Sequence, residues 1–362
     1  MSGIKDVAKR AGVSISTVSN VLNDSKYVSP ELKKRVEMAV KELNYVVNPI
    51  ARSMKNKKTG IIGVITEDVC GLFYPYVVRG INSVAEEKGY QVMLCDAKGT
   101  YGDPLAVKRE YQLFKQLLSN RVDGVIFVSS VKKEESESYF AKIRKMANAH
   151  KRIPFVSMER DFTDVGIDSV YFDGTANARM AVRHLIDSGC RKICHITGPR
   201  EMEVAKQRID SYIASMRESG MELDESKMIA YGDYSHQSGY LGMRELLEKV
   251  PDLDGVFCGN DQMAVGALKY LKEQGKKVPD EIKVMGYDDV FLASVVEPAL
   301  STIHIKKRHA GIEAAKMLFE RIEEDEEEEI SREPRGILME GSVVVRSSTA
   351  AGMPQDWDFV DW

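Results

Sequence analysis

Apolar residues in the first 45 positions recur at helical spacing in three short segments. Gly12 supplies a tight turn between the first two segments, Ser14 is suited to cap the second helix, and Ser29 and Pro30 begin the third. The positions expected to face inward are, in chain order, Ile4, Val7, Ala8, Ala11, Val18, Val21, Leu22, Leu32, Val36, Val40 and Leu43. Two short helices joined through a glycine turn and braced by a third predict a helix-turn-helix, whose second helix enters the major groove of DNA.

The second of these helices has an outer face made of small polar residues. The sequence VSISTVSNVLN, residues 13–23, is rich in Ser, Thr and Asn, although these residue types are mediocre helix formers. Such side chains gain little from facing water and gain more from facing an array of hydrogen-bond donors and acceptors. The pattern taken alone also fits a small three-helix bundle with a polar face.

Beyond residue 60 the pattern changes to short β-prone apolar runs, most of them separated by helical segments. The runs begin near residues 60, 90, 124, 154, 192, 255 and 282, and the helical segments span 76–88, 105–118, 176–188, 203–219 and 261–274. Alternation of apolar strands with helices predicts parallel sheets covered by helices on both faces. The number of runs predicts two α/β lobes, and ligands bind such sheets beyond the carboxyl ends of the strands.

Charge separates the two parts of the chain. Residues 1–60 contain 12 Lys and Arg against 5 Asp and Glu, a balance of +7, whereas the whole chain of 362 residues carries −4. A basic head on an acidic body is the electrostatic pattern of a protein that binds the phosphate backbone at one end. The charge therefore favours the DNA-binding interpretation over the plain helical bundle.

Composition narrows the class of protein further. No apolar run approaches the length of a membrane span, and the N-terminus MSGIKDVAKRAG has no apolar signal segment. Five scattered cysteines predict buried reduced thiols and a cytoplasmic location. Neither a phosphate-binding glycine loop nor an HExxH pair occurs, so we expect no enzyme, no cofactor and no metal site.

Several motifs give the chain a resemblance to the lactose-repressor (LacI/GalR) family of bacterial transcription regulators. The motifs are IKDVAKRAGVSISTVSNVLN, LNYVVNPIARSM, TGIIGVI, VDGVIFVSS, GNDQMAVGAL, VPDEIKVMGYDD and VVVRSSTA, which together extend from about residue 3 to residue 349. The resemblance implies a DNA-binding head, a hinge helix and a two-lobed body like that of periplasmic sugar-binding proteins. It also implies a homodimer that binds near-palindromic double-stranded operator DNA.

The resemblance divides the chain into four parts: a head at 1–47, a hinge helix and linker at 48–59, a body at 60–349 and a tail at 350–362. Within the body we expect a first lobe at about 60–160 plus 293–322 and a second lobe at about 161–292 plus 323–346.

The same resemblance assigns roles on the second helix. Ile15, Ser16 and Asn20 fall where the family reads base edges, and Asn20 can pair bidentately with adenine. Family positions that hold backbone phosphates are occupied by Ser14, Thr17, Ser19 and Asn23. The chemistry agrees, because hydroxyl and amide groups bind phosphate oxygens and fix the register of the protein on the duplex.

The segment NPIARSMKN, residues 48–56, resembles the family's hinge helix. There Asn48 caps the helix, Ala51 lets two hinge helices pack closely, and Met54 stands at the position of the wedge inserted into the minor groove.

The resemblance also implies an effector pocket between the lobes. The residues at the family's pocket positions are Phe73, Tyr74, Arg160, Arg208, Asn260 and Asp288. We expect Arg208 and Asp288 to face each other across the cleft and to bind a polar, sugar-like ligand between them.

We therefore predict a DNA-binding repressor whose operator affinity is switched by a small ligand. Two alternatives stay open at this point. One is a catabolite regulator controlled by a phosphorylated carrier protein, and the other is a solute-binding protein of a transporter. The basic head and the absent signal segment argue against the second alternative.

Overall fold

The computed structural model describes residues 3–23, 26–45, 58–97, 105–148, 153–324 and 333–352. Contacts divide the chain into two compact units, Met1–Gly60 and Ile61–Trp362. In the part of the chain that the structure describes, every helix is too short or too polar to cross a membrane.

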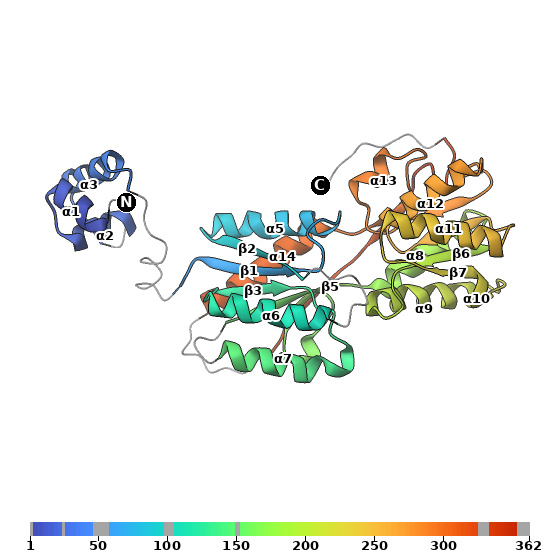
Figure 1. Cartoon of the computed structure of the whole chain (residues 1–362), viewed down its shortest axis with the longest axis horizontal. Helices are drawn as coiled ribbons and strands as arrows, with labels where there is room; N and C mark the ends of the chain where they lie inside the picture. The colour runs from blue at the N-terminus through green and yellow to red at the C-terminus, as the bar shows by residue number, and fades with distance from the viewer. Residues whose placement is uncertain are drawn as a thin grey trace. The chain divides into compact units, whose positions relative to one another are not determined.

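The first unit is a three-helix head formed by α1 (Ile4–Ala11), α2 (Ile15–Asn23) and α3 (Pro30–Glu42) (Figure 1). Gly12 ends α1 in the left-handed region with φ 65°. Arg35 of α3 secures the turn, because its Nη2 donates to the carbonyl oxygen of Ala11 at 2.6 Å. The core of the head consists of Val7, Ala8, Ala11, Val18, Val36 and Ala39. The predicted helix-turn-helix is confirmed.

The first lobe of the second unit is built on a six-stranded parallel sheet in the order β11-β5-β4-β3-β1-β2. Its strands are β1 (Ile61–Thr66), β2 (Gln91–Asp96), β3 (Gly124–Phe127), β4 (Phe155–Glu159), β5 (Asp168–Phe172) and β11 (Gly336–Met339). Helices α5 (Tyr74–Glu87) and α14 (Lys307–Glu323) pack on one face, and α6 (Ala106–Ser119) and α7 (Lys133–Ala147) pack on the other. A short 3-10 turn, Thr163–Val165, precedes β5.

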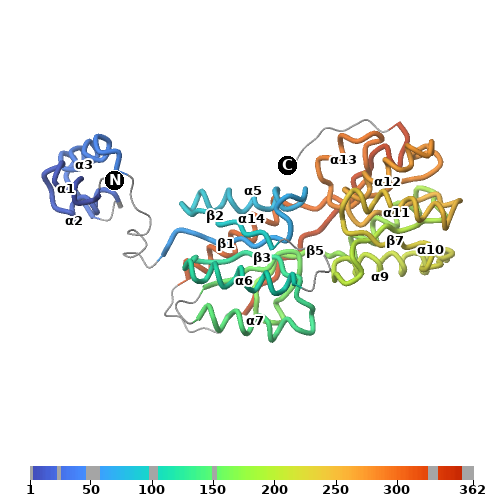
Figure 2. The backbone as a smooth tube through the Cα atoms, viewed as in Figure 1, coloured from blue at the N-terminus to red at the C-terminus, as the bar shows by residue number. Residues whose placement is uncertain are grey.

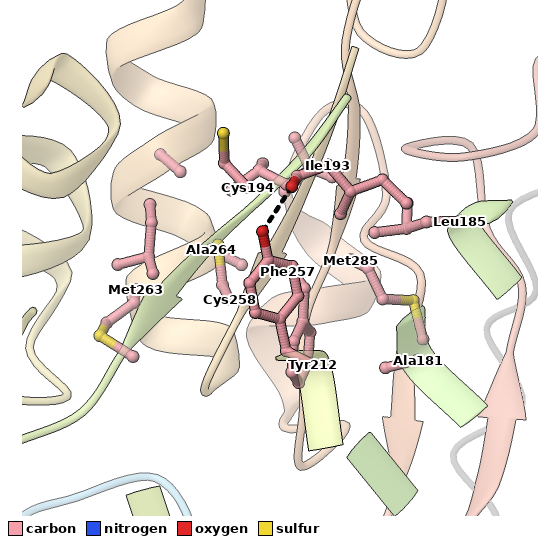
Figure 3. Packing of buried hydrophobic residues seen from close by; sticks show 14 of the residues in the cluster. Ala181, Leu185, Ile193, Cys194, Tyr212, Phe257, Cys258, Met263, Ala264 and Met285 are labelled. Atoms are coloured by element: carbon pink, nitrogen blue, oxygen red, sulfur yellow. Dashed lines mark hydrogen bonds between the residues drawn. The ribbon is translucent and has the colours of Figure 1, made fainter. Parts of the chain in front are cut away.

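The second lobe is built on a four-stranded parallel sheet in the order β7-β6-β8-β9. Its strands are β6 (Ile193–Thr197), β7 (Ile229–Tyr231), β8 (Gly255–Cys258) and β9 (Lys283–Met285). The surrounding helices are α8 (Gly174–Asp187), α9 (Glu203–Glu218), α10 (Glu225–Met228), α11 (His236–Lys249), α12 (Asp261–Glu273) and α13 (Phe291–Val295). Figure 3 shows part of this core, in which the hydroxyl of Tyr212 donates to the carbonyl oxygen of Ile193 at 2.7 Å.

The chain passes between the lobes three times, after β5, before α14 and after β11 (Figure 2). On the second-lobe side of these passages, β10 (Thr302–His304) and β12 (Ser342–Val344) form a small antiparallel sheet. An isolated bridge between Met285 and Ser301 connects this segment to the end of β9. The two lobes are therefore joined by three connections, an arrangement suited to hinge motion.

The observed lobe boundaries correct the sequence-based ones. The first sheet includes β5 and β11, which we had expected in the second lobe, whereas the segment 293–305 lies with the second lobe. A buried ion pair gives the physical reason for β5, because Arg321 of α14 contacts Asp168 with Nε at 2.6 Å and Nη2 at 2.9 Å. The predicted fold class, an N-terminal all-helical head followed in the sequence by two α/β lobes, is confirmed.

Candidate functional site

The N-terminus of α2 carries a cluster of hydroxyl groups. Ser14 caps the helix, since its Oγ accepts from the backbone N–H of Thr17 at 3.0 Å. The same Oγ lies 2.7 Å from the Oγ of Ser16 and 2.8 Å from the Oγ1 of Thr17. These hydroxyls can turn toward an acceptor at a helix end, where the helix dipole already favours a phosphate.

The orientation of α2 agrees with the predicted one. Val18 is completely buried, whereas Ile15 is 45% exposed and Ser16 is exposed beside it. Ser19 and Asn20 are half-buried. The side chain of Asn23 and the three hinge residues Asn48, Ala51 and Met54 lie outside the described residues, so their predicted roles stay predictions.

The body contains a cavity of about 290 Å³ between its two lobes. Residues within three positions of a strand end contribute to its lining from both sheets: Glu67 comes one residue after β1, Asn260 two residues after β8, and Asp288 three residues after β9. Glu159, the last residue of β4, also lines it. The cavity thus lies at the carboxyl ends of the strands, as expected for parallel α/β sheets.

Arg208 of α9 is the central cation of the second-lobe wall. Only 8% of the residue is exposed, and its Nη1 donates to the carbonyl oxygen of Gly259 at 2.5 Å. The guanidinium carbon lies 3.9 Å from the centre of the Tyr287 ring, a cation–π arrangement. Arg208 is therefore held rigidly by its own lobe at the edge of the cavity.

Asp288 lies on the same wall as Arg208, because α9 and β9 both belong to the second lobe. The expectation that the two residues face each other across the cleft is therefore wrong. Burial raises the pKa of Asp288 to about 6, although Arg208 and Lys307 act in the opposite direction. The Nζ of Lys307 donates to the backbone carbonyl of Asp288 at 2.5 Å, which ties this turn to the start of α14.

Asn260 lines the cavity, but its amide group is engaged within the protein. Its Oδ1 accepts from the backbone N–H of Met263 at 2.9 Å and so caps α12. Its Nδ2 donates to the carbonyl oxygen of Tyr234 at 3.0 Å. The contribution of Asn260 to the site is therefore to position α12 and the loop at Tyr234.

Aromatic and acidic side chains form the first-lobe wall. Phe73 packs edge-on against Tyr74 and Phe172, with ring centres 5.4 and 6.2 Å apart. Glu159 has a left-handed backbone with φ 71°. Burial raises its pKa to about 8, and the negative charges of Glu67 and Asp288 add to this effect, whereas a hydrogen bond with Tyr74 and the charge of Arg208 oppose it.

Arg160 is not among the residues that line this cavity. Its Nη1 donates to the carbonyl oxygens of Ser129 and Val131, and its guanidinium carbon lies 4.7 Å from the centre of the Phe162 ring. Arg160 lines a wider neighbouring cleft of about 1320 Å³ instead. It braces the loop after β3.

The structure thus brings together five of the six predicted pocket residues, namely Phe73, Tyr74, Arg208, Asn260 and Asp288. It adds Glu67, Glu159, Tyr234 and Tyr287, which the sequence reasoning missed. A usable signal existed for the two glutamates, because each stands at the end of an apolar β-prone run.

Comparison with known proteins gives a family match for each of the two parts of the chain, the head and the body. Residues 3–48 match the family model "Bacterial regulatory proteins, lacI family", and residues 182–349 match "Periplasmic binding protein-like domain". The chain is 34% identical over 340 residues to the ribose operon repressor of Escherichia coli, covering 94% of this chain and 99% of the relative. It is 32% identical over 344 residues to the HTH-type transcriptional repressor PurR of Vibrio atlanticus, covering 95% and 99%.

Solved structures give the same result. A lac repressor dimer bound to operator and an anti-inducer superposes with a TM-score of 0.82 at 26% identity, covering 96% of this chain and 99% of the repressor. The transcriptional regulator CelR in complex with cellobiose superposes with a TM-score of 0.66 at 30% identity, covering 96% and 100%. The chain belongs to the lacI family of bacterial regulatory proteins.

Proposed function

We propose that this chain is a cytoplasmic repressor that binds a near-palindromic operator as a homodimer and responds to a small sugar-like ligand in the interlobe cavity. The observation that carries the proposal is the cavity itself, which both lobes line and whose lining includes Gly174 and Ile305 from two of the chain connections. A ligand held between two lobes favours one lobe separation over another, and so provides the differential affinity that a switch requires.

Residues on the head support the DNA-binding half of the proposal. The exposed hydroxyls at the start of α2 and the +7 balance of residues 1–60 suit a phosphate backbone. Ile15 offers an apolar surface for a thymine methyl group, and Asn20 offers an amide for adenine. The names of the relatives, a ribose operon repressor and the repressor PurR, describe proteins with the same task.

Residues of the cavity support the ligand-binding half. Arg208 can donate to ligand hydroxyls, Asp288 can accept from them, and Phe73 can cover an apolar ring face. Repression needs no reaction, so we propose that the ligand is bound and released unchanged. A coupling of roughly 1–3 kcal/mol between ligand and operator is typical of such switches and must be reciprocal.

Operator selection followed by titration of the full chain tests this function. Selection from random duplexes should recover a two-fold symmetric site that is bound with Kd of roughly 10⁻⁸–10⁻¹¹ M at physiological salt. Affinity should fall steeply as salt rises, because the basic head displaces counterions. Recovery of no symmetric site, or a salt-independent affinity, would contradict the proposal.

A further inference from the structure

A groove of about 630 Å³ lies on the second lobe, outside the interlobe cavity. It is lined by α8, α9 and the end of β12. Met180, Ile186, Val343 and Val345 contribute its apolar side chains, and all four are half-buried. Met180, Ile186 and Val343 pack with one side against the second-lobe core, so that their remaining surface faces the groove. None of the four residues lines the ligand cavity.

The charged groups at the edge of the groove are paired with one another. The Nη1 of Arg179 lies 2.7 Å from Glu218, and the Nε of Arg183 lies 3.2 Å from Asp187. Among the described residues that line the groove, these two pairs contain every Arg, Lys, Asp and Glu. The groove therefore offers its apolar surface to a partner, and apolar surface of this kind edged by polar groups marks a contact site.

Residues 353–362, with the sequence MPQDWDFVDW, follow the last described residue. This segment contains both tryptophans of the chain, Trp357 and Trp362, together with Phe359 and Val360. Segments that stay in water are poor in aromatic residues, because large apolar side chains gain free energy by leaving water. Acidic and aromatic residues alternate in the run DWDF, so an extended backbone would place the two rings on one face. The composition is that of a segment with one face to bury.

The chain reaches this segment from the wall of the groove. The Oγ1 of Thr349 lies 2.8 Å from the Nε2 of His184, a lining residue of α8, and 2.6 Å from the Oγ of Ser301. Gly352, the last described residue, comes three positions later. Ten further residues can extend up to about 35 Å, whereas a helix of 14 residues such as α8 is about 21 Å long. The segment is therefore long enough to follow the whole of α8.

We propose that residues 353–362 dock in this groove of their own chain. The rings of Trp357 and Phe359 contact the apolar side chains of α8 and of the β12 end, and the acidic residues of the segment face water. Docking removes aromatic surface and groove surface from water together, which supplies the binding free energy. The short tether to Thr349 keeps the effective concentration of the segment at the groove high.

The docked segment bridges two elements that adjoin the connections between the lobes. Helix α8 begins at Gly174, after the connection from β5, and β12 begins at Ser342, after the connection from β11. A segment that contacts both elements holds the second-lobe ends of these two connections together. This inference concerns a surface outside the ligand cavity, so it goes beyond the proposed function and does not depend on it.

Tryptophan fluorescence of the full chain tests the proposal, because both tryptophans lie in this segment. The reference is a synthetic peptide of residues 353–362. In the full chain the emission should lie at shorter wavelength than in the peptide, and quenching by acrylamide should be severalfold weaker, because docked indole rings leave water. Emission and quenching equal to those of the peptide would overturn the proposal.

Met180→Glu supplies the groove-specific part of the test. A carboxylate among the apolar groove residues opposes burial of the rings, so emission and quenching should approach the values of the peptide. Met221→Glu is the matched control, because Met221 is also half-buried against the second-lobe core but lies outside the groove. This control should keep the tryptophans protected. Full protection in a Met180→Glu protein whose circular dichroism is native would overturn the proposal.

A photo-crosslinking residue tests the same contact without altering the groove. In Phe359→p-benzoylphenylalanine, irradiation should join residue 359 to α8 or to residues 343–345, as located by mass spectrometry, in a product with the mass of one chain. Crosslinks that fall only on other parts of the body would overturn the proposed groove. A product with the mass of two chains would assign the segment to the groove of a second copy and overturn docking within one chain.

Discussion

Polar side chains gather in two regions of this molecule, the outer face of α2 and the lining of the interlobe cavity, and their partners differ. On α2 the hydroxyls of Ser14, Ser16 and Thr17 bond one another at an exposed helix end. In the cavity Arg208 and Asn260 are buried and bond to the backbone of their own lobe. Buried polar groups need hydrogen-bond partners within the protein, whereas exposed polar groups can bond to water or to a bound molecule.

The difference teaches that lining a cavity and binding a ligand are separate properties. A residue such as Asn260 lies at the ligand site because it builds the site. On α2 the exposed face can change without loss of the core that Val18 and Val36 form. Substitutions on α2 should therefore alter binding alone, and substitutions of buried cavity residues should alter both binding and folding.

Arg208→Ala should give the largest effect. It leaves the carbonyl of Gly259 without its donor and removes the cation from the Tyr287 ring, so the unfolding free energy of the body should fall by about 2–4 kcal/mol. Thermal and urea denaturation of the full chain measure the loss. Arg179→Ala is the matched control, because the Arg179–Glu218 pair is exposed and its removal should change little. If both variants lowered the unfolding free energy equally, the proposed difference between buried cavity residues and exposed residues would be contradicted.

Glu110 should make the stability of the body depend on pH. Burial raises its pKa to about 7, despite hydrogen bonds from Ser129 and Tyr139. The folded state then binds the proton more tightly than the unfolded state, so this contribution is present at low pH and is lost as pH rises from about 4.5 to about 7. The change should be on the order of 2 kcal/mol.

Denaturation midpoints of the body at pH 5 and pH 7.5 measure this loss. Glu110→Gln should flatten the dependence, since the amide does not titrate. The head, whose described polar face is made of hydroxyl and amide groups, provides the internal comparison. The raised pKa of Glu110 would be contradicted if the wild-type body became more stable between pH 5 and pH 7.5 and Glu110→Gln removed that gain.

Asn20→Ala should weaken binding to the cognate operator by about 1–3 kcal/mol and relax specificity at one symmetric pair of base positions. Thr17→Ala should weaken binding to all sequences alike, because a phosphate contact carries no sequence information. Competition binding with single-base operator variants separates the two results. If both substitutions lowered affinity uniformly, Asn20 would not read a base. Neither should shift the unfolding of the body.

Asn260→Ala should give the smallest effect, a loss of about 1 kcal/mol in stability through the missing cap on α12. Asn260→Ser keeps a side-chain oxygen for the N–H of Met263 and should restore most of that loss. Thermal unfolding checks both variants. An Asn260→Ala protein with unchanged stability but no ligand response would show that Asn260 binds the ligand directly.

Periodicity alone predicts a large part of the fold. Buried Val18 and exposed Ile15 agree with the helical pattern of residues 13–23, and the β-prone runs near 60, 124 and 255 correspond to β1, β3 and β8. The sequence pattern does not predict β5, because Asp168 and Ser169 interrupt its apolar character. Asp168 is buried there in an ion pair with Arg321, far along the chain, and the buried hydroxyl of Ser169 bonds to the backbone of Phe162 and Ile167.

The pocket shows the same limit of sequence-based prediction for a single residue. The family resemblance points to Arg160, yet it is the preceding residue, Glu159, that lines the cavity. Consecutive residues along a strand point to opposite faces, and here the backbone at Glu159, the last residue of β4, is left-handed. Similarly, Arg208 and Asp288 were identified from the sequence, but not their place on one wall.

The sequence by itself determined the helix-turn-helix, the polar face of α2, the separation of charge between head and body, and the alternation of strands and helices. These features depend on neighbouring residues and local periodicity. Only the tertiary structure decided which lobe holds β5 and β11, and which carboxylates share the cavity with Arg208. Such contacts join residues far apart in the chain, 153 positions in the Asp168–Arg321 pair, and depend on how complete sheets and helices pack.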